Sequence, residues 1–445
     1  MLYSLICGEV MMDRNKFEEI YVNYGERKYP IETVRSVKNC YIANEQRELA
    51  IKAASEKIRL IKQDAIADVV DFFNCLKRCY SGYDYFFTDE MCDKIQKTII
   101  RQIKIWPGKI SNRRLQFYIF RELASIINDC HFELYVCNQT RFLQKQYIAY
   151  VADILLCKEA NGYHVVTGNA DFTQGQFLKE EEVKDFLLPT LYLGEGSSLD
   201  KEYYLLGIYS DNKVKDITLY GKRIKLHRIL SDKVVQTAES NVISEDGYVK
   251  VNHSTYVMPW DEELLQEYYE DGCRCSKQDA VILNLAGNRG GSSSYPQRFF
   301  EGLIGSGENG FSGAYLPNPA DVCDELKKYE LDFADRSVSS SYKGKLYVVM
   351  NNETASSAEM GVSSAFYVKN VVCVGSGTLG CSTFGNCVMF QLQRSKILFR
   401  FGHRLFYHDG FDEGKGFVPD YWIDDENPVE VVEKWIRRKN GIHCN

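Results

Sequence analysis

The stretch LYVVMNNETASSAEMGVSSAFYVKNVVCVG, residues 346–375, decides the fold. Its apolar run at 346–350 predicts a strand, and the polar residues 351–355 predict a turn. A helical stretch follows from Ser356 to about Tyr367, and a second apolar run lies at 371–374. Strand, turn, helix and strand in this order form a βαβ unit, which requires a parallel sheet with helices on its faces. The sequence therefore predicts an α/β core.

An earlier apolar run, AVILNL at 280–285, belongs to the same core. A continuous apolar run is typical of a parallel strand that is buried on both faces. This run ends in the glycine-rich loop GNRGG at 287–291. In parallel sheets, ligands and chemistry are found at the carboxyl ends of the strands. The glycine-rich loop and Ser356 both fall at such ends, so we expect the site there.

The preceding chain changes character twice. Up to about residue 130, apolar residues recur at steps of three and four, as in Ile58, Ile61 and Ala65, which predicts amphipathic helices. Between 146 and 256 the period approaches two, with Gly, Asn and Asp turns between the runs, which predicts strands. We expect an α/β (α+β multi-domain) chain: a helical N-terminal domain at 1–130, a β-rich middle module at 146–256 and an α/β catalytic core at 257–445.

Composition excludes several classes of protein. The 445 residues are 45% hydrophobic and 26% charged, with a net charge of −7, which is ordinary for a globular chain and unlike a nucleic-acid-binding one. The basic run KRIKLHR at 222–228 alternates with apolar residues and predicts a strand with a solvated basic face. No apolar run approaches the ~20 residues of a membrane-spanning helix. We expect no nucleic acid and no membrane as partners.

The cysteines and the N-terminus bear on the compartment. Fifteen cysteines are scattered, mostly within apolar runs, and the N-terminus lacks the basic region of a signal peptide. We therefore expect unpaired thiols packed as small hydrophobic side chains and a cytoplasmic location.

Ser356 allows two interpretations. Ser-x-x-Glu before a helix is a capping box, in which Ser356 is the N-cap and Glu359 the third helical residue. The alternative is a nucleophile on a sharp strand-to-helix turn, where the backbone N–H of Ser357 and the helix N-terminus stabilise a developing oxyanion. The pattern alone leaves both open.

Three motifs, taken together, resemble one family. NLAGNRGG at 284–291, NETASSAE at 352–359 and GFVPD at 416–420 resemble, in order and spacing, the signatures of the tail-specific (C-terminal processing) serine proteases and the tricorn core protease. The resemblance implies a core of the ClpP/crotonase-like type. It also implies that Ser356 is the nucleophile and that the N–H groups of Ser357 and Gly290 form the oxyanion hole.

The resemblance also bears on the general base. The tail-specific branch uses a lysine about twenty-five residues after the serine, and that place holds Cys381 or Asn386 here, so a Ser–Lys dyad is not expected. In the tricorn-like branch a histidine and a glutamate serve the serine, and His131 and Glu413 match their positions. The bland alternatives are a buried histidine that bonds a carbonyl and a glutamate in a solvated loop.

These inferences predict a serine peptidase that cleaves peptides or unfolded chains through an acyl-enzyme on Ser356, with His131 as general base and Glu413 orienting it. The resemblance calls for no metal or organic cofactor, and the middle module is at best PDZ-related. A homo-oligomer is left open. The alternatives are a catalytically inactive relative that binds peptides or hydrophobic ligands, and a scaffold in which Ser356 only caps a helix. We also expect that Cys381 is not the nucleophile, since no basic residue is close to it in sequence.

Overall fold

The computed structural model describes residues 13–26, 29–233, 241–245, 247–256, 261–305, 312–315 and 341–441. The chain divides into two compact units, each assembled from separate segments. Unit 1 comprises residues 1–145, 312–333 and 381–414, and unit 2 comprises residues 146–311, 334–380 and 415–445. The three consecutive segments expected from the sequence follow the type of secondary structure along the chain, whereas these units follow compactness.

Unit 2 is built on one large sheet. Its strands run in the order β14-β15-β16-β18-β19-β22-β9-β10-β6-β7-β8, and β13 also pairs with β6. The pairs β15–β16, β16–β18 and β18–β19 are parallel, with Leu283 opposite Val348 and Val348 opposite Cys373. The predicted βαβ unit and its parallel sheet are therefore confirmed. The bounds are β6 Ile148–Glu159, β7 Gly162–Thr167, β8 Phe177–Lys179, α8 Glu180–Val183, β9 Leu187–Thr190, β10 Tyr203–Ser210, β11 Asp216–Leu219, β12 Lys222–Lys225, β13 His227–Arg228, β14 Asn241–Glu245, β15 Tyr248–Asn252, α9 Glu262–Cys275, β16 Ala280–Asn284, α10 Ser294–Ile304, β18 Lys345–Met350, α11 Ser357–Ala365, β19 Val371–Gly375, β22 Tyr421–Trp422 and α12 Pro428–Lys439.

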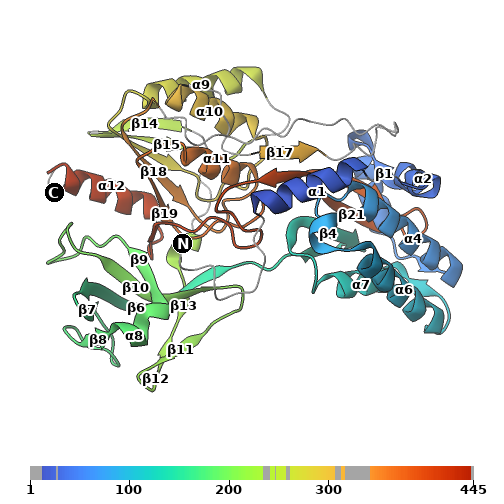
Figure 1. Ribbon diagram of the computed structural model, residues 1–445, viewed down its shortest axis with the longest axis horizontal. Helices are drawn as coiled ribbons and strands as arrows, with labels where there is room; N and C mark the ends of the chain where they lie inside the picture. The colour runs from blue at the N-terminus through green and yellow to red at the C-terminus, as the bar shows by residue number, and fades with distance from the viewer. Residues whose placement is uncertain are drawn as a thin grey trace. The chain divides into compact units, whose positions relative to one another are not determined.

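Successive side chains of the parallel strands point to opposite faces of the sheet, and helices cover both faces. Ile282, Tyr347 and Val349 point to one face and pack with Val432 and Ile436 of α12. The helices α9 and α10 lie side by side away from α12, as Figure 1 shows. Because helices cover both faces, the central strands are apolar throughout, which is why they read as continuous runs in the sequence.

The segment between residues 148 and 228 is antiparallel. Strands β9, β10, β6, β7 and β8 pair in succession, and β11 with β12 forms a separate hairpin. On β12, Lys222, Arg223 and Lys225 are exposed while Ile224 is buried. The prediction of a strand with a solvated basic face is confirmed.

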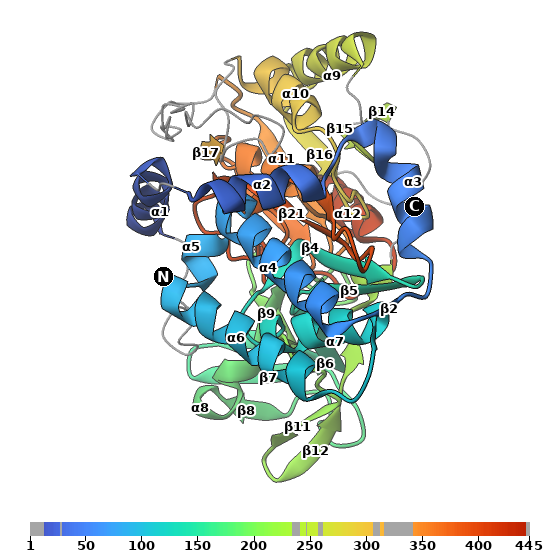
Figure 2. The same ribbon diagram turned by 90° about the vertical axis from the view of Figure 1, so that its right-hand side faces the viewer.

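Unit 1 combines helices from the start of the chain with strands from near its end. Its sheet has the order β1-β20-β21-β4-β5, with β17 also paired to β21. Figure 2 looks onto α4, α6 and α7, which cover this sheet and share its core. The bounds are α1 Arg14–Glu26, α2 Ile31–Cys40, β1 Tyr41–Ile42, α3 Arg47–Ala54, β2 Arg59–Leu60, α4 Lys62–Cys79, α5 Tyr83–Phe86, α6 Asp89–Ile105, β3 Ile110–Ser111, α7 Asn112–Leu123, β4 Asp129–Val136, β5 Gln139–Leu143, β17 Ser312–Tyr315, β20 Phe384–Gln391 and β21 Leu398–Tyr407. Within the described ranges, no helix has both the length and the apolar character needed to cross a membrane.

Candidate active site

Ser356 lies between β18 and α11 in an unusual backbone conformation. Its φ is 55° and its ψ is −121°. Ordinary N-cap residues of this chain are extended, as in Ser111 of α7 at φ −74° and ψ 147° and Thr88 of α6 at φ −100° and ψ 160°. A non-glycine residue in such a sparsely populated region costs about 1–3 kcal/mol and is found most often at functional sites. A cap alone does not require this conformation.

The capping box predicted from the sequence is nevertheless present. Oε2 of Glu359 accepts a hydrogen bond from the Ser356 N–H at 3.0 Å. Its other oxygen, Oε1, accepts from the Thr378 hydroxyl at 2.6 Å and from the Gly380 N–H at 2.8 Å. Glu359 is fully buried. It therefore ties the Ser356 turn to the loop that follows β19.

Gly290 packs directly against this turn. Its φ is 87°, and a Cβ atom there would lie 2.7 Å from the Ala355 carbonyl oxygen and 2.8 Å from the Ser357 nitrogen. Only glycine fits this position. The Gly290 N–H donates to Asn288 Oδ1 at 2.8 Å. The Gly290 N–H is therefore already hydrogen-bonded within its own loop. The Ser357 nitrogen, in contrast, is the first of α11, where the helix dipole favours negative charge. The oxyanion function of both N–H groups stays a prediction.

Asn351, just before the second motif, and Thr354 within it hold the glycine-rich loop and the Ser356 turn together. Oδ1 of Asn351 accepts hydrogen bonds from the N–H of Gly287 at 2.9 Å and of Glu353 at 3.1 Å. The hydroxyl of Thr354 donates to the Leu285 carbonyl at 2.9 Å. These residues are buried positioning groups, so the motif residues around Ser356 have a structural explanation of their own.

His131 lies in a bulge of β4 in unit 1. Strand β4 pairs Asp129 with Leu143 and Glu133 with Phe142 of β5, so three residues of β4 face a single step of its partner. Bulges re-aim side chains and are frequent beside active sites. The buried Asp129 stabilises the bulge, because Oδ1 accepts the His131 N–H at 2.8 Å and Oδ2 accepts the Tyr80 hydroxyl at 2.9 Å.

The surroundings of His131 disfavour the protonated form of its imidazole. Burial, together with the charge of Arg400, lowers its pKa to about 4, and a hydrogen bond to the backbone of Phe384 opposes this shift. The non-catalytic interpretation of His131, a buried histidine bonded to a backbone carbonyl, is thus met by this hydrogen bond, which uses one ring nitrogen. Since the pKa is about 4, the imidazole is neutral at neutral pH and is a weaker base than an ordinary histidine.

Glu413 is buried, which contradicts the alternative of a solvated loop. Its side chain is 9% exposed, and Oε2 accepts the N–H groups of Ser382 at 3.1 Å and Thr383 at 2.8 Å. An oxygen of Glu413, an oxygen of Asp129 and the sulfur of Cys130 lie within 4.8 Å of one another. Unit 1 therefore brings Glu413 into the same cluster as the segment that carries His131.

Cys130 and Cys381 form a disulfide with a Cα–Cα distance of 5.6 Å. The expectation that all cysteines are thiols is therefore wrong for this pair. The sulfur of Cys381 lies 3.5 Å from both Nδ1 and Nε2 of His131. A basic residue distant in sequence is thus close in space, which removes the reason given for an inert Cys381. The potential metal ligands Cys130, His131 and Cys381 lie within 4.8 Å of one another, but the disulfide occupies both sulfurs.

The five predicted site residues fall into two groups. Ser356, Ser357 and Gly290 are adjacent in unit 2, whereas His131 and Glu413 lie in unit 1, in two groups of close side chains that share Cys130. Contact between Ser356 and His131 stays a prediction. Sequence reasoning missed Asp129 as the support of the bulge and missed the disulfide. The Asp-x-His spacing was a signal for Asp129, whereas no local pattern marks a pair 251 residues apart.

Comparison with known proteins gives similarity in structure alone. No protein-family model matches the chain, and no curated protein does. Similar solved structures include a candidate peptidase from Parabacteroides merdae (12% identity, TM-score 0.47, covering 86% of this chain and 99% of that one). They also include the photosystem II D1 C-terminal processing protease (11%, 0.37, 81% and 93%) and the tricorn protease (12%, 0.37, 85% and 37%).

By their names, these structures are peptidases and proteases, among them a C-terminal processing protease and the tricorn protease. The chain resembles them in its multi-domain α/β fold, and at these identities the likeness concerns the fold alone.

Proposed function

We propose that the chain is a serine peptidase that cleaves peptides or unfolded chains through an acyl-enzyme on Ser356. The observation that carries the proposal is the Ser356 backbone, at φ 55° and ψ −121° on the strand-to-helix turn. A strained turn of this kind presents a nucleophilic hydroxyl at the top of a parallel sheet, ahead of a helix N-terminus. The Ser357 N–H at the start of α11 is the oxyanion donor in this mechanism.

His131 is the proposed general base. A neutral imidazole takes the hydroxyl proton as Ser356 attacks the scissile carbonyl, and returns it to the leaving amine. The pKa of about 4 keeps the base unprotonated at neutral pH. Glu413 and Asp129 lie next to Cys130, which precedes His131, and burial raises the pKa of Asp129 to about 7. In this proposal Glu413 orients His131 and stabilises the transient imidazolium, and residues 146–256 have no assigned role in recognition.

A fluorophosphonate probe tests the proposal, because phosphonylation requires an activated serine and a formed oxyanion hole. We expect labelling of Ser356 in the wild type, none in Ser356→Ala, and a loss of at least about a hundredfold in His131→Ala. Matched controls are Ser111→Ala, which removes an ordinary cap, and His164→Ala, which removes a half-buried histidine paired with Glu159. Both should label like the wild type.

The alternative outcomes separate the remaining interpretations. A folded wild type that is never labelled favours an inactive relative that binds peptides or hydrophobic ligands. Undiminished labelling in His131→Ala means that another residue is the base. We also propose a cytoplasmic location and no nucleic-acid or membrane partners. A homo-oligomer is left open.

A further inference from the structure

The disulfide between Cys130 and Cys381 stands apart from the other cysteines. Ten further described cysteines are free, and seven of them are fully buried, including Cys79 and Cys373. Burial raises the pKa of the Cys79 and Cys387 thiols to about 12, which keeps them protonated and unreactive. Cys137 and Cys273 are half-buried but are not joined to another cysteine, and among the described residues Cys130 and Cys381 form the one disulfide, which makes them the candidate for thiol–disulfide chemistry.

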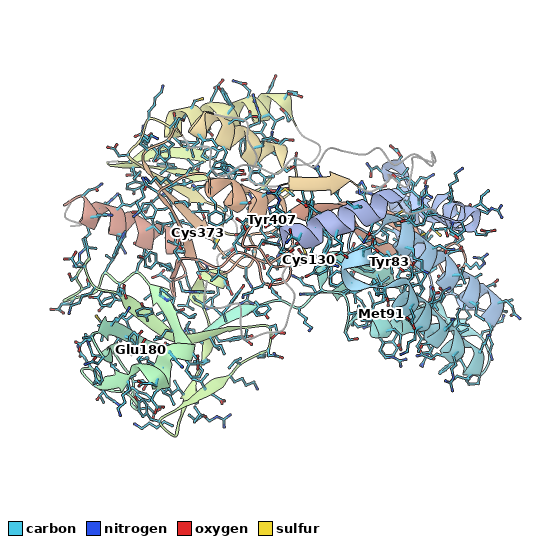
Figure 3. The ribbon with its side chains drawn as sticks, in the orientation of Figure 1. Tyr83, Met91, Cys130, Glu180, Cys373 and Tyr407 are labelled. Carbon is cyan, nitrogen blue, oxygen red and sulfur yellow. A yellow bond between two sulfur atoms is a disulfide. The ribbon has the colours of Figure 1, made fainter. Side chains whose placement is uncertain are left out.

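The pair also has a distinctive location. Cys130 belongs to the β4 bulge and immediately precedes His131, and Figure 3 labels it. Cys381 lies three residues before β20. The disulfide joins two segments that are 251 residues apart and ties the strand that carries His131 to the segment whose N–H groups, at Ser382 and Thr383, bind Glu413.

The redox state of Cys381 changes what its sulfur offers to His131. A disulfide sulfur carries no proton, so the imidazole nitrogen that is not bonded to Phe384 keeps its lone pair. A Cys381 thiol, 3.5 Å from both nitrogens, carries an S–H that can donate to that lone pair. An imidazole nitrogen that accepts this S–H no longer offers its lone pair to the proton of a serine.

We propose that Cys130 and Cys381 are a reversible redox modification site that controls His131, with the disulfide form competent and the dithiol form inhibited. Reduction by a small dithiol breaks the protein S–S bond and forms one in the reagent; two electrons and two protons pass to Cys130 and Cys381. A small-molecule disulfide reverses the reaction. The effect on peptidase activity rests on the proposed function, whereas the effect on the imidazole does not.

Two single variants distinguish control of His131 from simple stabilisation. Cys130→Ala leaves a permanent thiol at Cys381, next to His131, and imitates the dithiol form. Cys381→Ala removes the disulfide equally and removes the sulfur that lies 3.5 Å from the ring nitrogens; the thiol that it leaves, Cys130, lies within 4.8 Å of the imidazole. If the disulfide only stabilised the fold, the two variants would behave alike. Cys137→Ala is the matched control, since Cys137 is a free, half-buried cysteine just beyond the end of β4.

The experiment measures fluorophosphonate labelling of Ser356 with and without dithiothreitol, in the presence of EDTA so that no metal is held by reduced thiols. We expect dithiothreitol to slow labelling at least about tenfold in the wild type and in Cys137→Ala. Cys130→Ala should be labelled slowly under both conditions. Cys381→Ala should be labelled at least about tenfold faster than Cys130→Ala and should not respond to dithiothreitol.

Two further measurements do not depend on Ser356. Peptide mapping without reduction should recover the linked Cys130 and Cys381 peptides. The imidazole ¹⁵N signals of His131, assigned by their loss in His131→Gln, should shift on reduction of the wild type but not of Cys381→Ala. Equal labelling of Cys130→Ala and Cys381→Ala, absence of the linked peptides, or unchanged His131 signals would overturn the proposal. If no form is labelled, the proposed function fails, and the His131 signals still decide this proposal.

Discussion

Substitution of Ser356 by glycine tests whether its backbone is strained. At φ 55° and ψ −121°, a side chain at position 356 is disfavoured, whereas glycine adopts positive φ without cost. Ser356→Ala keeps the strained backbone and removes the hydroxyl. Ser356→Gly removes the hydroxyl and the strain together. The comparison of these two variants therefore isolates the backbone contribution.

The expected difference follows from three contributions. Relief of strain favours glycine by about 2 kcal/mol. At an N-cap, glycine is better than alanine by about 1 kcal/mol. The greater freedom of glycine in the unfolded chain opposes this by about 1 kcal/mol. Ser356→Gly should therefore be more stable than Ser356→Ala by about 2 kcal/mol, although both variants lose the nucleophile.

The same pair of substitutions at Ser111 is the control. Ser111 caps α7 with its side chain on the Arg114 N–H, but at an ordinary φ of −74°. Without strain, the cap and entropy contributions nearly cancel, and the glycine and alanine variants should agree within about 0.5 kcal/mol.

The assay is thermal unfolding followed by circular dichroism. For a unit of this size, about 2 kcal/mol corresponds to an increase in Tm of about 4–8 °C for Ser356→Gly over Ser356→Ala. Equal Tm values at position 356, or the same difference at 356 and at 111, would refute the strain argument. The proposed function would then lose the observation that carries it.

Three further predictions follow from the same geometry. Because the His131 pKa is lowered to about 4, the rate of Ser356 labelling should stay nearly constant from pH 7 to pH 5.5 and fall only near pH 4. A tenfold loss at pH 5.5 would mean either an ordinary histidine of pKa about 6.5 or control of the rate by Asp129, whose pKa burial raises to about 7. Gly290→Ala should lower the Tm and abolish labelling, because its Cβ would meet the backbone of the Ser356 turn. Gly175→Ala is the control: its φ is similar, but nothing lies within 4 Å of the added Cβ, so the Tm should fall slightly and labelling should stay intact. Cys130→Ala and Cys381→Ala should destabilise the protein to the same extent, by about 2–5 kcal/mol in denaturant unfolding, and a clear difference between them would show that one cysteine has a separate packing role.

The central strands were predictable from the sequence because of their environment. Runs such as 280–285 and 346–350 are apolar at every position, since helices cover both faces of the sheet. The turn between β18 and α11 was equally visible, because Ser356 and Glu359 have the spacing of a capping box. Sequence patterns within a short stretch of the chain were sufficient to predict these strands and this turn.

The remaining features depend on long-range pairing. Glu413 stands in a polar stretch and is nevertheless buried, because the N–H groups of Ser382 and Thr383 receive its carboxylate. Strand β4 is completed by β21, more than 250 residues later, so the helical start of the chain gives no hint of the sheet that it covers. The φ of Ser356 also could not be read from sequence, because serine at an N-cap is ordinarily extended.

The two interpretations of Ser356 describe one structure rather than two. Glu359 accepts the Ser356 N–H, as a capping box requires, and the same carboxylate accepts the Thr378 hydroxyl and the Gly380 N–H. A hydrogen bond contributes about 0.5–1.5 kcal/mol, so three of them offset the cost of about 1–3 kcal/mol for the strained φ. The cap is thus what holds Ser356 in a conformation that a cap would not need. A serine kept at this cost, with the Ser357 N–H next to it at a helix N-terminus, is the observation on which the proposed nucleophile rests.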